Sequence, residues 1–250
     1  MKNSVSANKV IKMETAEKIL VRGAKEIGIQ IGGSELEKFK LYSQLIKKWN
    51  EKINLVSYPD EEELYRLHFL DSLMCGLGFD FQGNCNVIDL GSGAGFPGVP
   101  LKICFPELEV SMVDARKKRT KFLQLVINDL HLKKSLVIWD RLENIGHQRE
   151  HRGIYDCAVA RALAPLNVLL EYAMPLLHQG GKFVALKGFN IEEEIKEADN
   201  ALQILGGRLE KVIPYSYPGE RGRHVVIVEK IAVTPDKYPR RAGVPVKRPL

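Results

Sequence analysis

Alternate glycines follow a short apolar stretch in the segment VIDLGSGAGFPG, residues 87–98. They are Gly91, Gly93 and Gly95. Because glycine has no Cβ, the backbone of such a turn can bend tightly and a ligand can approach it closely. Pro97 suits the first turn of a helix that would start there. The pattern predicts a ligand-binding turn that joins a buried strand to a helix.

Two classes of nucleotide cofactor bind at turns of this kind, and the last glycine separates them. A dinucleotide requires the spacing GxGxxG, in which the diphosphate lies against the N-terminus of the helix. Phe96 occupies the position of that last glycine here, where its side chain would fill the space of a diphosphate. S-adenosylmethionine has no phosphate, and Asp89 at the end of the strand would complement its positively charged amino acid part. The turn therefore favours a methyl donor over a nicotinamide dinucleotide.

Polar residues also follow the next two predicted strands. Asp114 ends the second strand, where an acid can accept hydrogen bonds from both ribose hydroxyls of either cofactor. The segment 140–143, Asp-Arg-Leu-Glu, follows the third strand, where a polar side chain and backbone amides could hold an adenine edge. A polar loop occurs after a strand in any fold of this class, so this segment has little weight by itself.

A sheet must bring these loops together, and the sequence predicts one. Short apolar runs indicate strands at 87–90, 110–114, 135–140, 155–161, 182–187 and 224–231. Helices are expected between them, at 97–104, 116–131, 165–177 and 191–205. Continuous Val, Ile and Leu runs that alternate with helices are typical of an α/β fold with a mostly parallel, doubly wound sheet. In such sheets ligands bind at the carboxyl ends of the strands, where the three loops lie.

The first eighty residues have a helical pattern instead. Residues 8–56 carry apolar side chains at helical spacing, and a second helix is expected from Asp60 to about Cys75. Glycine and polar residues then interrupt the pattern, which places a boundary near residue 80. We expect an N-terminal helical extension at 1–80, a catalytic domain at 81–231 and a basic, proline-rich tail at 232–250.

Two residues of the second helix form a pair that could do acid–base chemistry. His68 and Asp71 are three positions apart and are therefore neighbours on one helix face. No nucleophile stands beside them, and such a pair more often ties a helical lid to a domain. Asn54 and His68 could equally close over the donor pocket.

The composition limits the class of protein. Of 250 residues 45% are hydrophobic, which is enough for a full core, and the formal net charge is +6. The chain has no run of eighteen apolar residues, and its start lacks the apolar block of a secretory signal. Its four cysteines lie far apart without a CxxC pair, which argues against a zinc site and a disulfide framework. We expect a soluble cytoplasmic protein with no metal and no membrane partner.

Basic residues gather in three segments that could bind a polyanion. They are Arg116, Lys117, Lys118 and Arg119 after the second strand, Arg221 and Arg223 before the last strand, and Arg240, Arg241, Lys247 and Arg248 in the tail. Positive charge at a helix N-terminus opposes the helix dipole, so a phosphate contact explains the first group better than helix stability does. The tail contains four prolines and should lie extended, without helix. Nucleic acid is the expected partner, with solvated surface charge as the alternative.

Several short segments occur in a characteristic order. They are DLGSGAGFPG, VDARKKR, DRLE, ARAL, FVALKG and KYPRRAGVPVKRPL. Together they resemble the GidB/RsmG family of bacterial small-subunit ribosomal RNA methyltransferases, over about residues 35–250. The resemblance implies a class I, Rossmann-like fold with a seven-stranded sheet. It also implies transfer of the methyl group of S-adenosylmethionine to N7 of one guanine in the decoding region of 16S rRNA.

The resemblance assigns roles to matching positions. It places the donor at Gly91, Phe96, Asp114, Leu142, Glu143 and Arg161, and Asp89, Gly93, Gly95 and Ala115 complete the expected cofactor-binding set. In the family, alanine usually precedes the glutamate of the third-strand segment, whereas this chain has Leu142. Leu142 is therefore expected to contribute its backbone amide to adenine rather than its side chain.

The implied reaction demands little from side chains. N7 of guanine has a lone pair and no proton, so its methylation requires neither a general base nor a covalent nucleophile. After the fourth strand the chain reads ARALAPLN, with neither the Asn/Asp-Pro-Pro-aromatic segment of amine methyltransferases nor a cysteine beside proline. In-line alignment of N7, the methyl carbon and sulfur can supply about 7 kcal/mol of barrier lowering.

Two cations at strand ends are the expected catalytic residues. Arg161 and Lys187 end the fourth and fifth strands and could hold O6 of guanine or the flanking phosphates. Alternatively, each forms an ion pair with Asp89, Asp140 or Glu143 and only shapes the pocket.

Two other functions stay open on the same residues. A small-molecule methyltransferase would have no use for the distributed basic residues, and a non-catalytic RNA-binding protein would not need an intact glycine turn. The expected partner is 16S rRNA or the small ribosomal subunit. The sequence does not define the oligomeric state, and we take a monomer as the expectation.

Overall fold

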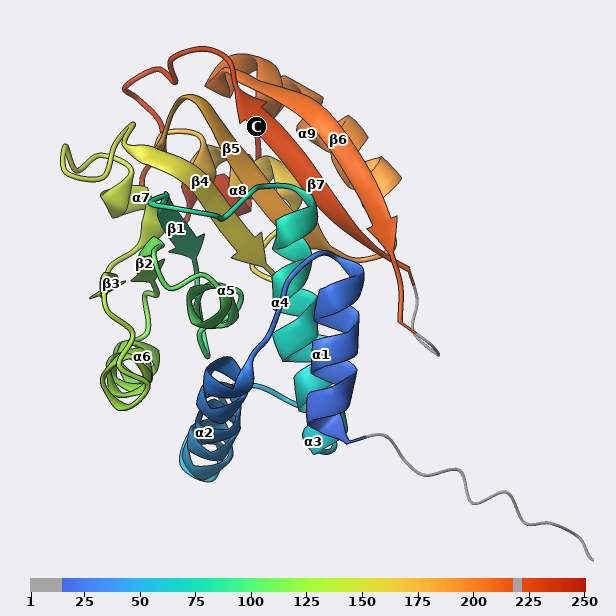
Figure 1. Cartoon of the computed structure of the whole chain (residues 1–250). Coiled ribbons are helices and arrows are strands. Elements are labelled where there is room, and N and C mark those ends of the chain that lie inside the picture. The colour runs from blue at the N-terminus through green and yellow to red at the C-terminus, as the bar shows by residue number, and fades with distance from the viewer. Residues whose placement is uncertain (1–14, 218–221) are drawn as a thin grey trace, which may run out of the picture.

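The computed structural model describes residues 15–217 and 222–250 and is built around one sheet (Figure 1). Its strands are β1 (Asn86–Leu90), β2 (Glu109–Val113), β3 (Ser135–Ile138), β4 (Tyr155–Arg161), β5 (Leu177–Lys187), β6 (Gly207–Tyr215) and β7 (Arg223–Lys230). They lie in the order β3-β2-β1-β4-β5-β7-β6, and among them β7 alone runs antiparallel to its neighbours. The order reverses between β1 and β4, so the loops after these two strands lie at the switch point where such sheets bind ligands.

Helices cover both faces of the sheet (Figure 1). The N-terminal helices are α1 (Ala16–Glu26), α2 (Gly33–Asn50) and a continuous segment of α3 (Glu61–Leu64), η1 (Tyr65–Leu70), α4 (Asp71–Leu73) and η2 (Met74–Leu77). The others are α5 (Gly98–Cys104), α6 (Lys117–Asp129), α7 (Leu142–Ile145), α8 (Leu166–Ala173), α9 (Ile191–Leu205) and α10 (Val244–Lys247). The continuous segment 61–77, from α3 to η2, forms a helical strap.

The sheet is buried on both faces, in two separate cores. Within β1, Val87 packs in a core with α1, α2, α5, α6 and the helical strap, and its neighbour Ile88 packs in a core with α7, α8 and α9. Neighbouring residues of a strand point to opposite faces, so a strand that contributes to two cores is mostly apolar, as Val87, Ile88 and Leu90 are in β1. The predicted α/β fold with a doubly wound sheet is confirmed.

The sequence analysis locates six of the seven strands and misses β6. This strand lies at the sheet edge and has no fully buried residue, and charged residues occupy the middle of its sequence, GRLEKVIPY. Its pattern therefore resembles a surface loop more than a strand. In the N-terminal region the expected helical run 8–56 contains α1 and α2, which residues 27–32 separate, and its residues 8–14 lie outside the described residues.

The prolines of the C-terminal segment predict an extended chain without helix, and this prediction is wrong. It contains α10, where Pro245 sits in the first turn and so has no intrahelical hydrogen bond to lose. Before α10, Arg240 donates to both oxygens of the buried Glu171, with Nε–Oε1 at 2.9 Å and Nη2–Oε2 at 2.5 Å. Arg152 donates to the carbonyl of Tyr238 at 2.8 Å. The segment is thus part of the folded body.

Two features are absent from the described residues. Within 15–217 and 222–250, no helix is long and apolar enough to cross a membrane. The same ranges contain no group of three or more His, Cys, Asp or Glu side chains that could hold a metal ion.

Candidate active site

The glycine turn after β1 gives its glycines different tasks. Their φ angles are +69° at Gly91, +58° at Gly93 and +104° at Gly95, all in the left-handed region. A Cβ on Gly93 would make ordinary van der Waals contact, 3.8 Å from Nη1 of Arg119 and from the Gly91 carbonyl oxygen. A Cβ on Gly95 would lie 2.6 Å from Cγ2 of Val99 and 2.7 Å from the hydroxyl oxygen of Tyr42. Packing therefore requires glycine at position 95, whereas at position 93 only the backbone conformation does.

Asp89 is buried at the carboxyl end of β1 and is only half satisfied. Its Oδ2 accepts a hydrogen bond from the backbone N–H of Gly98 at 3.0 Å, whereas its Oδ1 has no partner among the described residues. Burial raises the pKa of this carboxyl to about 7, against the opposing effects of hydrogen bonding and of the Arg161 charge. A buried acceptor without a donor is costly, so Oδ1 of Asp89 is a candidate partner for a donor group or a cation of a ligand.

Asp114 joins the second loop to the glycine turn. Its Oδ2 accepts from the backbone N–H of Gly93 at 3.0 Å and lies 3.4 Å from Nη1 of Arg119. Its Oδ1 accepts from the backbone N–H of Arg116 at 2.7 Å. The next residue, Ala115, is exposed and accepts a hydrogen bond on its carbonyl from the Trp139 indole at 3.2 Å. The loops after β1 and β2 therefore meet, as their place in the sheet predicts.

The segment after β3 uses its side chains inside the fold. Leu142 packs in the core with 8% of its surface exposed. Glu143 is buried, and its Oε1 accepts from the backbone N–H of Gly243 at 2.9 Å and from the Tyr172 hydroxyl at 3.4 Å. Asp140 accepts from the backbone N–H of Arg141 at 2.7 Å, at the start of α7. Glu143 thus has a structural contact with the C-terminal segment, which folds over α7, and its contact with the cofactor stays a prediction.

Phe96 also has a contact that the sequence does not indicate. Its ring is 5% exposed and lies within an aromatic cluster, with centroids 5.7 Å from Tyr42, 6.0 Å from Phe69 and 5.2 Å from His68. The ring that would fill the space of a diphosphate therefore packs under the N-terminal helices. Its main effect is to join the glycine turn to those helices.

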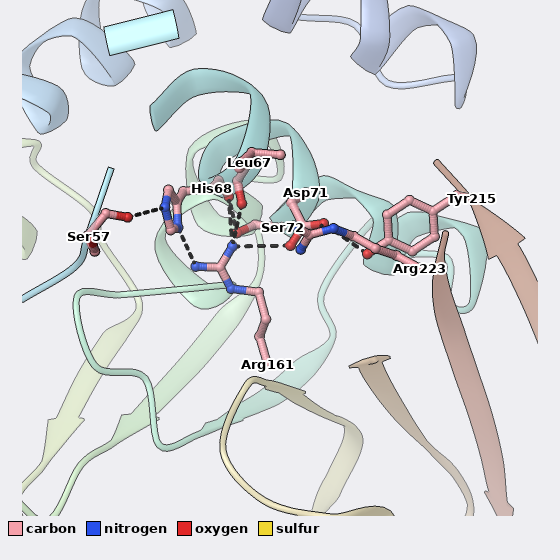
Figure 2. Close-up of polar contacts among 8 residues, drawn as sticks. All are labelled: Ser57, Leu67, His68, Asp71, Ser72, Arg161, Tyr215 and Arg223. Carbon is pink, nitrogen blue, oxygen red and sulfur yellow. Dashed lines mark hydrogen bonds and ion pairs between the residues drawn. The ribbon is translucent and has the colours of Figure 1, made fainter. Parts of the chain in front are cut away.

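Arg161 ends β4 and points its guanidinium at the helical strap (Figure 2). Nη1 donates to Oδ2 of Asp71 at 3.2 Å and to the Leu67 carbonyl at 3.1 Å. Nη2 donates to Nδ1 of His68 at 2.9 Å, and the guanidinium carbon lies 4.6 Å from the centre of the Phe96 ring. The alternative partners Asp89, Asp140 and Glu143 do not form this ion pair; Asp71 does.

Asp71 connects the helical strap to three strands. Its side chain is 1% exposed, and besides Arg161 it accepts from the Tyr215 hydroxyl at 2.9 Å and lies 3.4 Å from Nη1 of Arg223 (Figure 2). These partners come from the ends of β4, β6 and β7. Burial and the neighbouring Asp71 charge raise the pKa of Tyr215 well above its ordinary value. The His68–Asp71 pair could serve acid–base chemistry or tie the N-terminal helices to the domain. This geometry favours the second role, because Asp71 links the helical strap to the sheet.

His68 is held as a neutral ring. Burial, and then the charge of Arg161, lower its pKa to about 4. Because Arg161 donates to Nδ1, the proton must be on Nε2, which lies 3.2 Å from the Ser57 carbonyl and donates to it (Figure 2). Both ring nitrogens are therefore engaged, and neither is available as a general base. Asn54 lines a separate hollow with residues 55–58.

Lys187 ends β5 and is held by two groups. Its Nζ donates to the Ala164 carbonyl at 2.9 Å and lies 2.5 Å from Oε2 of Glu194, with 9% of the side chain exposed. The ion-pair partner of Lys187 is thus Glu194 from α9 and not one of the expected alternatives, Asp89, Asp140 or Glu143. An ammonium has three N–H groups, so these contacts leave one.

A cavity of about 570 Å³ opens beside these two cations. Its wall includes Asp71, Arg161, Lys187, Phe189, Tyr215 and Arg223. The volume lies in the range of small-molecule sites. Two of these residues were not among the predicted site residues. Tyr215 lies in β6, a strand that the sequence pattern does not reveal. Phe189 could have been found, because it is an aromatic residue directly after Lys-Gly at the end of a strand.

The expected RNA-binding residues divide into exposed and engaged groups. The exposed ones are Arg116, Lys117, Lys118, Arg241, Lys247 and Arg248. The engaged ones are Arg119 with Asp114, Arg223 with Asp71 and Arg240 with Glu171. Arg221 lies outside the described residues. The C-terminal segment therefore offers fewer free charges than its sequence suggests.

Comparison with known proteins identifies close relatives of the sequence. A family model described as GidB, rRNA small subunit methyltransferase G, matches residues 35–225. A "Ribosomal RNA small subunit methyltransferase G" from Acetivibrio thermocellus is 43% identical over 93% of this chain and 96% of its own length. One from Pelotomaculum thermopropionicum is 44% identical over 95% of this chain and its full length.

Solved structures add the fold. The crystal structure of fibrillarin from Aeropyrum pernix, with natively bound S-adenosyl-L-methionine, is similar with a TM-score of 0.51 and 16% identity. The match covers 63% of this chain and 72% of that protein. At this identity the likeness supports the shared sheet architecture and no more.

Proposed function

Because this chain belongs to the GidB family of rRNA small subunit methyltransferases, we propose that it methylates N7 of a guanine in the decoding region of 16S rRNA with S-adenosylmethionine. The match over residues 35–225 carries the proposal, since it spans the glycine turn, Asp114 and the ends of β4 and β5 together. The partner would be the small ribosomal subunit or its RNA. We expect the protein to act in the bacterial cytoplasm and as a monomer.

The site fits this donor in charge and shape. S-adenosylmethionine supplies a methyl group activated by a positively charged sulfur. Oδ1 of Asp89, buried without a partner among the described residues, would balance the charge of its amino acid part, and the backbone at Gly93 would lie against the donor. Asp114 would accept the ribose hydroxyls in place of its bonds to Gly93 or Arg119. The backbone after β3 would contact adenine, since Leu142 and Glu143 are buried.

Among the described residues that line the cavity, both carboxylates, Asp71 and Glu194, are held in ion pairs, which suits an N7 acceptor. N7 attacks with a lone pair and loses no proton, so what it needs from the protein is position. His68, the nearest candidate base in the strap, is neutral and uses both nitrogens. The cavity at the ends of β4 and β5 is the proposed acceptor site.

Arg161 and Lys187 are proposed to orient the acceptor guanine through their remaining N–H groups. The contacts of Arg161 with Asp71, Leu67 and His68 use three of its five N–H groups. Held in this way, the guanidinium cannot swing away and can serve as a fixed donor to O6. Lys187 has one N–H left and would act on O6 or a flanking phosphate.

Exposed basic residues would supply the phosphate contacts. Arg116, Lys117 and Lys118 stand at the start of α6, beside the loop that carries Asp114. Lys117 Nζ lies 4.6 Å from the centre of the Trp139 ring, which is 56% exposed. A cluster of cations with an exposed indole suits single-stranded RNA, because phosphates and bases are recognised together. This surface lies next to the donor site.

The decisive experiment is methyl transfer to an unmodified substrate. Ribosomal RNA and 30S particles from a strain that lacks the modification would be incubated with the protein and labelled S-adenosylmethionine. Label in 16S rRNA, with chain cleavage at one 7-methylguanine after borohydride and aniline treatment, is the expected result. The proposal fails if label enters RNA without that cleavage, or if only small molecules are labelled.

A further inference from the structure

The side chain of Tyr42 connects the N-terminal helices to the glycine turn. Tyr42 lies on α2, 52 positions before Ala94, and its hydroxyl donates to the backbone carbonyl of Ala94 at 2.5 Å. Its side chain is fully buried. Burial raises the pKa of this phenol well above its ordinary value, so the hydroxyl keeps its proton and stays a donor. A residue outside the sheet thus holds the backbone between Gly93 and Gly95.

Aromatic packing fixes the position of this hydroxyl. The Tyr42 ring stacks on Phe69 of the helical strap, with centroids 5.2 Å apart and ring planes 15° apart. Its centroid also lies 5.7 Å from that of Phe96. Ala94 and Phe96 are the two neighbours of Gly95 in the chain, so Tyr42 contacts the turn on both sides of this glycine. A fully buried ring in a close-packed cluster cannot move its hydroxyl away without displacing its neighbours.

The glycine turn needs a restraint from outside, because its own residues give it little stiffness. Gly91, Gly93 and Gly95 all have left-handed φ angles. Glycine loses more conformational freedom on ordering than any other residue. A loop that is ordered only when its ligand binds loses affinity by the cost of that ordering, whereas a loop already held in the bound conformation does not. A hydrogen bond to the middle of the turn would therefore strengthen ligand binding.

We propose that Tyr42 is a positioning residue for the methyl donor and that its hydroxyl holds the glycine turn in the conformation that binds S-adenosylmethionine. This inference rests on the proposed function and adds to it a residue of the N-terminal helices. Tyr42 itself would not touch the donor, since its side chain is buried and its hydroxyl is bonded to Ala94. Donor affinity thus depends on how α2 packs against the turn.

Tyr42→Phe tests the hydroxyl alone, because phenylalanine keeps the ring and its packing. Calorimetry at a temperature where the variant is fully folded should give a Kd for S-adenosylmethionine about 5-fold higher than in the wild-type protein. The affinity for 16S rRNA, measured without donor, should stay unchanged. A hydroxyl that only stabilises the fold would lower the free energy of unfolding and leave the donor Kd as it is.

Tyr155→Phe is the matched control. Tyr155 is also buried, and its hydroxyl oxygen lies 2.7 Å from Nδ1 of His151. It begins β4, at the opposite end of this strand from Arg161 and the donor side of the sheet. This variant should lose stability as Tyr42→Phe does, but it should bind S-adenosylmethionine with the wild-type Kd.

Hydrogen exchange gives a readout that requires no ligand. The amides of Gly95 and Phe96 both donate to the Ser92 carbonyl, at 2.7 Å and 2.9 Å. In Tyr42→Phe these two amides should exchange several-fold faster than in Tyr155→Phe, because only the first variant loosens the turn. Equal rates in the two variants would contradict a restraint on the turn.

The outcomes separate the two proposals. If the wild-type protein does not bind S-adenosylmethionine or does not methylate N7 of 16S rRNA, the proposed function fails. If it does both, but Tyr42→Phe and Tyr155→Phe bind the donor equally well, the role of Tyr42 is overturned. Should Tyr42→Phe not fold, the wild-type protein decides: by linkage, the donor should slow exchange of the Tyr42 hydroxyl proton more than that of Tyr155. Equal slowing would overturn the role.

Discussion

The guanidinium of Arg161 and the carboxylate of Asp71 lie 3.2 Å apart, although 90 positions separate them in the sequence. Both side chains are nearly buried, at 12% and 1% exposed. Asp71 also contacts Tyr215 and Arg223, so one carboxylate joins the helical strap to β4, β6 and β7. The proposed acceptor cavity is therefore held together by a contact that the N-terminal segment supplies.

Loss of the Asp71 charge should destabilise the fold strongly. Asp71→Asn leaves Arg161 with a weakened partner in a buried site, which we expect to cost about 3 kcal/mol in urea unfolding. Arg161→Gln should cost a similar amount, and the double variant should cost less than the sum, because the two residues share one interaction. Glu37→Gln breaks the exposed Lys40–Glu37 pair and should change stability by less than 0.5 kcal/mol, roughly. Additive costs would contradict the coupling.

Protonation of His68 should weaken the fold in mild acid. Its pKa is about 4 in the folded protein and 6.5 when unfolded. Between these values the unfolded chain binds a proton that the folded protein does not, so stability falls as pH decreases from 6.5 to 4, by about 3 kcal/mol from this residue. His68→Asn cannot titrate and keeps an acceptor for Arg161. Urea unfolding across this range should show a shallower decline for the variant, and parallel curves would contradict the assignment.

Donor binding should depend on the ionisation of Asp89. Burial raises its pKa to about 7, and the proposed contact with the positive charge of the donor requires the ionised form. Affinity should therefore increase as pH rises through 7, with binding roughly tenfold weaker at pH 6 than at pH 7.5. Calorimetry on Asp89→Asn should give weak binding that does not change over this range. A pH-independent affinity in the wild-type protein would exclude the contact.

Two glycine variants should separate packing from ligand access. In Gly95→Ala the new Cβ meets Val99 and Tyr42 at 2.6–2.7 Å in a left-handed backbone, so we expect a loss of about 2–5 kcal/mol. In Gly93→Ala the Cβ makes only ordinary contacts at 3.8 Å, so backbone strain alone should cost about 1–2 kcal/mol. Gly93→Ala should nevertheless bind the donor more weakly. Equal stability losses would refute the division of tasks.

The phosphate contacts at α6 can be measured through salt. Lys118→Gln should reduce the slope of log affinity for 16S rRNA against log salt by about 1. Lys196→Gln, an exposed lysine on α9, serves as the control and should leave the slope unchanged. If both variants behave alike, the start of α6 does not contact RNA.

The sequence predicts local features of this molecule well and distant pairings poorly. The strand at Tyr155–Arg161 and the helix at Ile191–Leu205 match their expected limits, because apolar periodicity is set by residues close in the chain. The partners of Arg161 and Lys187 were not predictable. A cation at a strand end can reach any of several carboxylates. The helical strap that carries Asp71 is held in place by packing of apolar side chains, and the sequence does not show which apolar surfaces will pack together.

Glu143 shows the same limit at a single residue. Its position in a strand-end loop and the family resemblance both predict a contact with the cofactor, which stays a prediction. The hydrogen bond that its carboxylate accepts from Gly243, 100 positions later, could not be predicted, because it depends on the path of the C-terminal segment. By contrast, the contact between Asp114 and Gly93 follows from strand order, which the alternation of strands and helices predicts.

The C-terminal segment makes late truncation severe. A chain that stops before Arg240 would lose the guanidinium that neutralises Glu171 and the amide that satisfies Glu143, and both carboxylates would stay inside the protein without partners. Loss of the segment from Arg240 onward should therefore lower the stability of the whole protein, although this segment lies at the edge of the catalytic fold. The proofreading of this chain's length would thus be its own folding, since a shortened copy would expose itself to proteolysis.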